Sequence, residues 1–226
     1  MESKLIQFLS GFVTPERLSL FNRILSLRTN YLTIVLEDIY QTQNTSAVIR
    51  TADCFGIQNV HVIENKNEYQ VNPDVVRGAS NWITLNRYNE SEMNTTTALR
   101  KLRQDGYRIV LASPHDHDVD LESFDLTKGK AAIVFGCERP GLTEFANKEA
   151  DEFMKIPMVG FTESLNISVS AAITLHHLTH QLRNSDIVWH LTDQEKQKVL
   201  LDWLRVSIKR VDLLEEKFQE LNKTNI

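Results

Sequence analysis

Three polar segments of this 226-residue chain combine side chains that could orient a ligand or stabilise charge. The first begins at Asn44, which can cap a helix that we expect from about Thr45 to Phe55. Arg50 follows six residues later, nearly two turns further along that helix. A guanidinium stays protonated in proteins, so it binds phosphate or stabilises a developing negative charge rather than acting as a base. An ordinary cap and an exposed arginine are the alternative interpretation.

The second segment follows an apolar run at 131–135 that is typical of a buried strand. Gly136, Glu138 and Gly141 come directly after it, in a loop that an ordinary strand-to-helix turn would also explain. Ligands of open α/β sheets bind at the carboxyl ends of the strands. We therefore expect this loop to contact a ligand.

The third segment follows a strand-like run at 153–156 and leads into a helix expected over 166–183. It brings Ser164 and Asn166 to the beginning of that helix. Capping requires only one polar side chain, so it does not account for both residues. The segment is therefore a second candidate ligand loop.

Strands and helices alternate along the elements that must position these loops. Further strands are expected at 31–36, 60–63 and 107–112, and further helices at 14–28, 93–104, 143–149 and from Thr192 to about Leu214. The alternation predicts an α/β fold with a mainly parallel sheet and helices on both faces. We expect helical extensions at 1–30 and 186–226 around a central domain at 31–185.

The formal net charge of -5 argues against a nucleic-acid partner, because nucleic-acid-binding domains are often basic. The acidic charge is nevertheless concentrated in the centre. Residues 1–30 carry four basic and two acidic side chains, and residues 193–226 carry seven of each. Candidate phosphate contacts in the two extensions are Arg17, Arg23, Arg28, Lys209 and Arg210.

Several other classes of protein are disfavoured by missing signals. Cys54 and Cys137 form no CxxC pair, and the N-terminus does not resemble a signal peptide, so we expect a cytoplasmic protein. No apolar run approaches the ~20 residues that span a bilayer. The loop at 136–141 lacks the lysine of a P-loop. His115–Asp118 offers no third metal ligand, so no metal site is predicted.

Together, the three segments resemble the three motifs of the SpoU branch of the SPOUT methyltransferases. They are Asn44-Thr-Ser-Ala-Val-Ile-Arg50-Thr, then Phe135-Gly-Cys-Glu-Arg-Pro-Gly141, then Ile156-Pro-Met followed by Ser164-Leu-Asn-Ile-Ser-Val169. The resemblance covers roughly residues 14–210. It implies an enzyme that methylates a ribose 2′-hydroxyl of RNA, a deep C-terminal trefoil knot and a homodimer.

The resemblance also implies S-adenosylmethionine as the methyl donor, held largely through backbone groups. The matching positions are Ser113, Gly136, Ile156 and Leu165. The corresponding catalytic group comprises Arg50, Asn44, Glu138, Ser164 and Asn166. The family assigns deprotonation of the hydroxyl to the first-motif arginine. We favour a different role for Arg50, in which it binds a neighbouring phosphate and stabilises the alkoxide. A phosphate oxygen then accepts the proton.

Within the family, the short N-terminal extension and the segment Gln197–Arg205 resemble members that act on tRNA. The expected target is then the D-loop guanosine at position 18. Two alternatives stay open, a ribosomal RNA 2′-O-methyltransferase and a non-catalytic RNA-binding protein on the same fold.

Overall fold

The chain forms two compact units in a computed structural model that describes residues 2–113, 119–137 and 141–223. One unit spans residues 29–189. The other combines the residues up to 28 with those from 190 onward.

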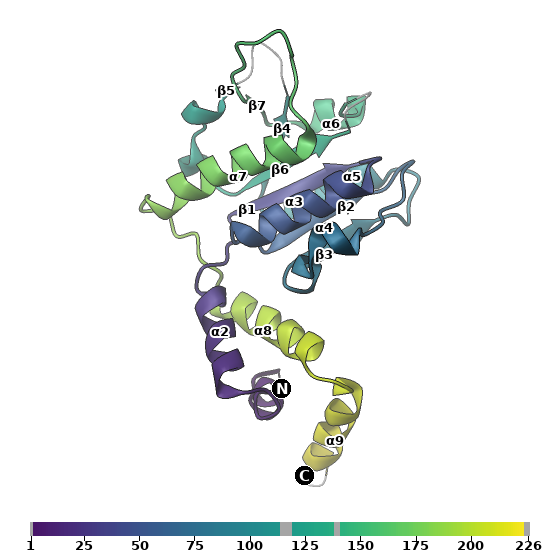
Figure 1. Ribbon diagram of the computed structural model, residues 1–226, viewed down its shortest axis with the longest axis vertical. Coiled ribbons are helices and arrows are strands. Elements are labelled where there is room, and N and C mark those ends of the chain that lie inside the picture. Colours follow the sequence, from purple (N-terminus) through teal and green to yellow (C-terminus); the bar gives the residue numbers. More distant parts are fainter. Residues whose placement is uncertain (1, 114–118, 138–140, 224–226) are drawn as a thin grey trace. The chain divides into compact units, whose positions relative to one another are not determined.

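The larger unit is built on a sheet in which every paired strand of the described residues runs parallel to its neighbours (Figure 1). Its strands are β1 (Leu32–Glu37), β2 (Asn59–Ile63), β3 (Thr84–Tyr88), β4 (Arg108–Ala112), β5 (Val119–Asp120), β6 (Ala131–Gly136) and β7 (Glu152–Lys155). They lie in the order β3-β2-β1-β6-β4-β7-β5. The central strands β1, β6 and β4 are apolar on both sides, as expected for a parallel sheet that is covered on both faces.

Helices cover both faces of this sheet, as predicted. The helices of this unit are α3 (Thr42–Cys54), α4 (Pro73–Val76), α5 (Asn94–Gln104), α6 (Glu144–Glu149) and α7 (Ile167–Arg183), with short 3-10 turns at Ala79–Asn81, Leu121–Ser123 and Leu126–Lys128. Helices α3 and α7 pack side by side on one face (Figure 1), and α5 packs with α6 on the other. Successive residues of β1 alternate between the two cores: Ile34 and Leu36 join the α3–α7 side, and Val35 joins the α5–α6 side.

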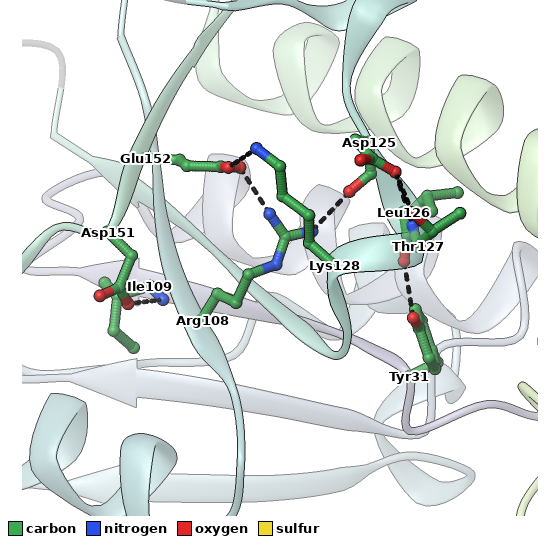
Figure 2. Close-up of polar contacts among 9 residues, drawn as sticks. All are labelled: Tyr31, Arg108, Ile109, Asp125, Leu126, Thr127, Lys128, Asp151 and Glu152. Carbon is green, nitrogen blue, oxygen red and sulfur yellow. Dashed lines mark hydrogen bonds and ion pairs between the residues drawn. The ribbon is translucent and has the colours of Figure 1, made fainter.

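The amino ends of β4 and β7 are joined by charged side chains (Figure 2). The guanidinium of Arg108 donates to Glu152 at 2.5 Å and to the backbone oxygen of Asp125 at 2.8 Å. Lys128 also pairs with Glu152. The carboxylate of Asp151 accepts from the backbone N–H of Ile109 at 2.7 Å. These bonds hold the amino ends of the two strands together, whereas ligands of open α/β sheets bind at the opposite, carboxyl ends of the strands.

The smaller unit contains α1 (Glu2–Ser10), α2 (Pro15–Leu25), α8 (Asp193–Ser207) and α9 (Val211–Lys223). Thr14 caps α2, and Thr192 with Glu195 forms a capping box at the start of α8, where the sequence predicts a helix to begin. The ring of Phe21 on α2 packs edge-on against Trp203 on α8, with ring centroids 5.5 Å apart. Two segments that are distant in sequence therefore share one small core.

The structure differs from the sequence prediction at the C-terminal helix and at strand β3. The C-terminal helix expected to run from Thr192 to Leu214 is interrupted between α8 and α9, where Arg210 adopts a left-handed backbone with φ of 54°. The apolar residues keep a helical spacing across this break, so the sequence pattern alone predicts one continuous helix. Strand β3 was not predicted, because its sequence includes Asn86 and Arg87 and it lies at the edge of the sheet, beside β2.

No helix among the described residues is long and apolar enough to cross a membrane. The trefoil knot that the resemblance implies stays a prediction.

Candidate active site

A cavity of about 440 Å³ opens at the carboxyl ends of β4, β6 and β7. The three strand ends supply part of its wall, and loops that follow β6 and β7 supply most of the rest. The lining comprises Ala112, Ser113, Phe135, Gly136, Cys137, Gly141, Leu142, Asn147, Met154, Lys155, Ile156, Met158, Ser164, Leu165, Ile167, Ser170 and Thr174. The mixture of apolar side chains and a few polar groups, together with the volume, is typical of a small-molecule site.

All four residues predicted to bind the cofactor line this cavity: Ser113, Gly136, Ile156 and Leu165. Ser113 continues β4 by donating its backbone N–H to Met154 of β7 at 2.9 Å. Gly136 ends β6, Ile156 directly follows β7, and Leu165 precedes α7. Strand ends and loops that are distant in sequence thus converge at one place, as the open edge of a parallel sheet allows.

Gly136 must be glycine because the chain folds back against it. A Cβ atom at this position would lie 2.7 Å from the carbonyl carbon of Gly141 and 2.7 Å from the backbone nitrogen of Leu142. Gly141 itself has a φ of 94°, which favours glycine. The two glycines therefore allow a tight loop whose backbone borders the cavity.

A second cavity of about 530 Å³ adjoins the first. It is lined by Ile39, Tyr40, Gln41, Asn44, Cys137, Ser164, Leu165, Asn166 and Ile167. Cys137, Ser164, Leu165 and Ile167 line both cavities and form the wall between them. Three predicted catalytic residues, Asn44, Ser164 and Asn166, are thus brought to this second cavity.

Asn44 and Asn166 are joined by a direct hydrogen bond. The Nδ2 of Asn166 donates to Oδ1 of Asn44 at 3.1 Å, and Nδ2 of Asn44 donates to Gln41 at 3.2 Å. Oδ1 of Asn166 caps α7 by accepting from the backbone N–H of Ser168 at 2.9 Å. The beginnings of α3 and α7 are therefore held together at the cavity, although 122 residues separate them.

Asn44 does not cap α3, contrary to the prediction. The helix begins at Thr42 after Gln41, and Asn44 lies buried within its first turn. An earlier start is compatible with the sequence because Thr42 and Gln43 tolerate helical backbone. From this buried position the Asn44 amide bonds to Asn166 through its oxygen and to Gln41, the N-cap residue of α3, through its nitrogen.

Arg50 lies away from both cavities of its own chain. It is exposed on α3 and lines neither cavity. Six residues of α-helix correspond to about 9 Å and about 600°, so Arg50 is turned roughly 120° away from Asn44. Glu138, the remaining predicted catalytic residue, lies outside the described residues, as does the segment His115–Asp118.

The predicted RNA contacts of the smaller unit differ in their exposure. Arg17 and Arg23 are exposed on α2, and Lys209 and Arg210 are exposed between α8 and α9. Arg28 is only 2% exposed, and its guanidinium carbon lies 5.4 Å from the centre of the Trp203 ring. This burial argues against a phosphate contact by Arg28, because such a contact requires a side chain that reaches the surface.

Sequence reasoning missed several residues that line the first cavity, among them Leu142, Asn147 and Thr174. Asn147 lies on α6 and Thr174 on α7, one turn or more beyond the motif loops. Helical periodicity from Asn166 and Ser170 would have indicated Thr174, but no pattern pointed to Asn147. Among the described residues, no group of three or more His, Cys, Asp and Glu side chains could hold a metal ion.

Residues 31–176 match the model of the SpoU rRNA Methylase family. The chain belongs to this family. A tRNA (guanosine(18)-2′-O)-methyltransferase from Borreliella burgdorferi is 44% identical to this chain over 212 residues, which cover 94% of this chain and 95% of that protein.

Two solved structures of SpoU enzymes show the same fold. The Aquifex aeolicus TrmH/SpoU tRNA modifying enzyme has a TM-score of 0.76 at 23% identity, covering 86% of this chain and 98% of that chain. The SpoU methyltransferase AviRb from Streptomyces viridochromogenes, solved with the cofactor AdoMet, has a TM-score of 0.60 at 23% identity, covering 72% and 62%. At these identities the similarity shows the fold alone.

Proposed function

We propose that this protein transfers a methyl group from S-adenosylmethionine to the ribose 2′-hydroxyl of guanosine 18 in the D-loop of tRNA. The observation that carries the proposal is the convergence of the three motifs on two adjoining cavities with a common wall. The Borreliella relative, with 44% identity over nearly the whole chain, has a name that describes this activity.

The first cavity is the proposed cofactor site. The cavity is bordered by backbone at Gly136, where a side chain would displace Gly141 and Leu142. Bare backbone of this kind can approach a ligand closely and hold it through main-chain groups. Apolar groups such as Met154 and Ile156 offer a surface for a flat base. AviRb, which shares the fold, was solved with AdoMet. When bound, S-adenosylmethionine supplies an electrophilic methyl group on a sulfonium.

The second cavity is the proposed site of the target nucleotide. Ser164 lines both cavities, so it would be able to contact both ligands when they are bound. The amides of Asn44 and Asn166 are bonded to each other beside this cavity, and they are proposed to position the ribose. The ribose oxygen gains a bond to carbon, the carbon–sulfur bond breaks, and the hydroxyl proton must leave.

Arg50 is proposed to stabilise the charge that develops on the ribose oxygen. Its guanidinium fork would bind a neighbouring phosphate and the emerging alkoxide together, while a phosphate oxygen takes the proton. Glu138 is proposed to help position these groups, as the motif resemblance implies.

We propose a homodimer as the active form. Arg50 lines neither cavity of its own chain, so a second copy can deliver it. Val169 and Ile173 lie one turn apart on α7 and expose 45% and 38% of their surface. Val159 and Phe161 are fully exposed in the loop that leads to α7. Such a group of exposed apolar side chains beside a site is typical of a protein interface.

The smaller unit is proposed to bind the body of the tRNA through Arg17, Arg23, Lys209 and Arg210. The domain at 31–185 would carry the chemistry, and the extensions at 1–30 and 186–226 would hold the substrate. We place the protein in the cytoplasm, with its tRNA substrate and without a metal cofactor.

A single-atom change in the substrate tests the proposal. Methyl transfer from labelled S-adenosylmethionine is measured on a tRNA transcript and on the same transcript with 2′-deoxyguanosine at position 18. A transcript with 2′-deoxyguanosine at a neighbouring position is the matched control. We expect label in the unmodified and control transcripts and none in the position-18 variant. Equal labelling of the position-18 variant would show that another nucleotide is the target.

A further inference from the structure

A buried carboxylate, outside the three motifs, connects the end of β1 to the loop that lines the first cavity. Glu37 is the last residue of β1 and is 1% exposed. In the sheet register it lies beside Gly136 of β6 on one side and Ile63 of β2 on the other. The alternation along β1 directs its side chain to the α5–α6 face, as it does for Val35.

Three hydrogen-bond donors converge on the Glu37 carboxylate. Oε2 accepts from the backbone N–H of Thr143 at 2.9 Å, and Oε1 accepts from the Thr143 hydroxyl at 2.8 Å. Oε1 also accepts from the hydroxyl of Thr95 on α5 at 2.6 Å. Burial of a carboxylate is costly unless such bonds replace its hydration. The donors therefore account for a carboxylate at this position.

Thr143 ends the loop that borders the cofactor cavity. It follows Gly141 and Leu142, which both line that cavity. Its hydroxyl also caps α6 by accepting from the backbone N–H of Ala146 at 3.1 Å. Both the amide and the hydroxyl of Thr143 thus point at Glu37, which fixes the place where the loop joins α6.

The end of the loop at Gly141 and Leu142 has little room to move. Gly141 and Leu142 already lie so close to Gly136 that no Cβ fits between them. A shift at Thr143 would therefore be passed directly to backbone that faces the cavity.

We propose that Glu37 is a positioning residue that acts through Thr143 to hold Gly141 and Leu142 in the shape that binds S-adenosylmethionine; this inference rests on the proposed function. A glutamine would not serve equally well. One of its two terminal atoms is an N–H₂ donor, and it would face either the Thr143 amide or the two hydroxyls that now donate to Glu37.

Four variants of the full chain test this role: Glu37→Gln, Thr143→Val, Thr143→Ser and Thr95→Val. Hydrogen exchange of the Thr143 amide is measured on the ligand-free protein, and the dissociation constant for S-adenosylmethionine is measured by calorimetry. We expect Glu37→Gln to speed the exchange and to weaken binding, each about tenfold or more, the scale of one lost hydrogen bond to a carboxylate. Thr143→Val should weaken binding similarly, and Thr143→Ser should restore it because the hydroxyl is retained.

Thr95→Val is the matched control because it removes a hydroxyl donor from the same Oε1 without touching the loop. It should leave both measurements within about threefold of the wild type. Unchanged exchange and affinity in Glu37→Gln would overturn the proposal, and so would equal effects of Thr95→Val and Thr143→Val. If Glu37→Gln does not fold, the comparison of Thr143→Val with Thr143→Ser tests the proposal: equal affinity of these two variants for S-adenosylmethionine would overturn it. A wild-type protein that fails to bind S-adenosylmethionine would refute the proposed function instead, while the exchange of the Thr143 amide would still report on Glu37.

Discussion

At the scale of single residues, the chemistry proposed here depends on the shape of one side chain, Arg50. It is exposed on α3, so its replacement should leave the fold intact. Arginine presents a planar fork that can bind phosphate and a second oxygen together, whereas lysine offers a point charge on a flexible stem.

The variant Arg50→Lys should therefore lower turnover about 100-fold, the usual cost of losing one preorganised donor to a developing oxyanion. Single-turnover methylation of a tRNA transcript measures this effect, and an unchanged thermal midpoint controls for folding. Near-normal turnover with lysine would show that the fork geometry is not required and that our assignment to Arg50 is wrong.

Burial also determines the protonation of His61, which lies on β2 on the face of the sheet that α5 covers. Its Nδ1 is 3.0 Å from the Tyr88 hydroxyl, and the two rings stack. Desolvation lowers the pKa of His61 from 6.5 to about 4. As the pH falls, His61 is therefore protonated in the unfolded chain before it is protonated in the folded one. The stability that neutral His61 allows above pH 6.5 is lost progressively as the pH falls towards 4.

We expect this residue alone to cost up to about 3 kcal/mol of stability over that range. Urea unfolding of the wild type and of His61→Phe at pH 7.5, 6.0 and 5.0 measures it. The variant should show the weaker dependence on pH because its ring does not titrate. Parallel pH profiles of the two proteins would contradict the assignment.

At the scale of elements, the beginnings of α3 and α7 form one unit through the bond between Asn44 and Asn166. Asn166 also caps α7, so its loss has a structural and a functional component. Replacement of Thr192, which caps α8 in the smaller unit, is the control that removes a helix cap without touching the proposed site.

The variants Asn166→Ala and Thr192→Ala should each lose about 1 kcal/mol of stability, the usual value of a helix cap. Only Asn166→Ala should also abolish most of the methyl transfer. Chemical denaturation and the methylation assay together test this pair. Comparable activity in both variants would place Asn166 outside the catalytic group.

Local sequence patterns predicted most elements because the apolar strands and the helix caps are strong local signals. The strands at 31–36 and 131–135 lie where the sequence indicated, and the helices expected from residue 14 and from Thr192 begin at caps on those residues. Strand β3 was missed because its side chains are half polar. Arg28 was expected at the surface, but only the tertiary structure shows that Trp203 covers it.

The candidate site was predictable only in part, and mainly through the resemblance to a family. The loops at Gly136 and Ser164 could be placed at strand ends from the alternation of elements. Their convergence on one cavity depends on the strand order, in which β4 lies between β6 and β7. No local pattern contains that order, and none indicated that Glu37 would hold Thr143.

At the scale of the whole molecule, we propose two features: a dimer in which each site uses residues of both chains, and a basic surface on the smaller unit. The net charge of -5 is compatible with tRNA binding if that surface carries the phosphate contacts.

Sharing of sites predicts complementation between two inactive subunits. Co-refolding Arg50→Ala with Asn166→Ala should restore about a quarter of the wild-type activity, because half of the dimers are mixed and each mixed dimer keeps one intact site. Each variant refolded alone is the control. No recovery in a mixture that contains mixed dimers would show that each chain uses its own Arg50.

The basic surface predicts a change in salt dependence. Neutralising Arg17, Arg23, Lys209 and Arg210 together should reduce the slope of log affinity for tRNA against log salt by about 3. Filter binding at several salt concentrations measures the slope, with Lys4→Gln as a single-charge control. An unchanged slope would place the phosphate contacts elsewhere.

The most direct test of the central claim is methylation of total tRNA and ribosomal RNA with labelled S-adenosylmethionine, followed by mapping of the modified nucleotide. We expect label in tRNA, at the 2′-oxygen of the D-loop guanosine at position 18. Label in ribosomal RNA alone, or no label in RNA that the protein binds, would contradict it.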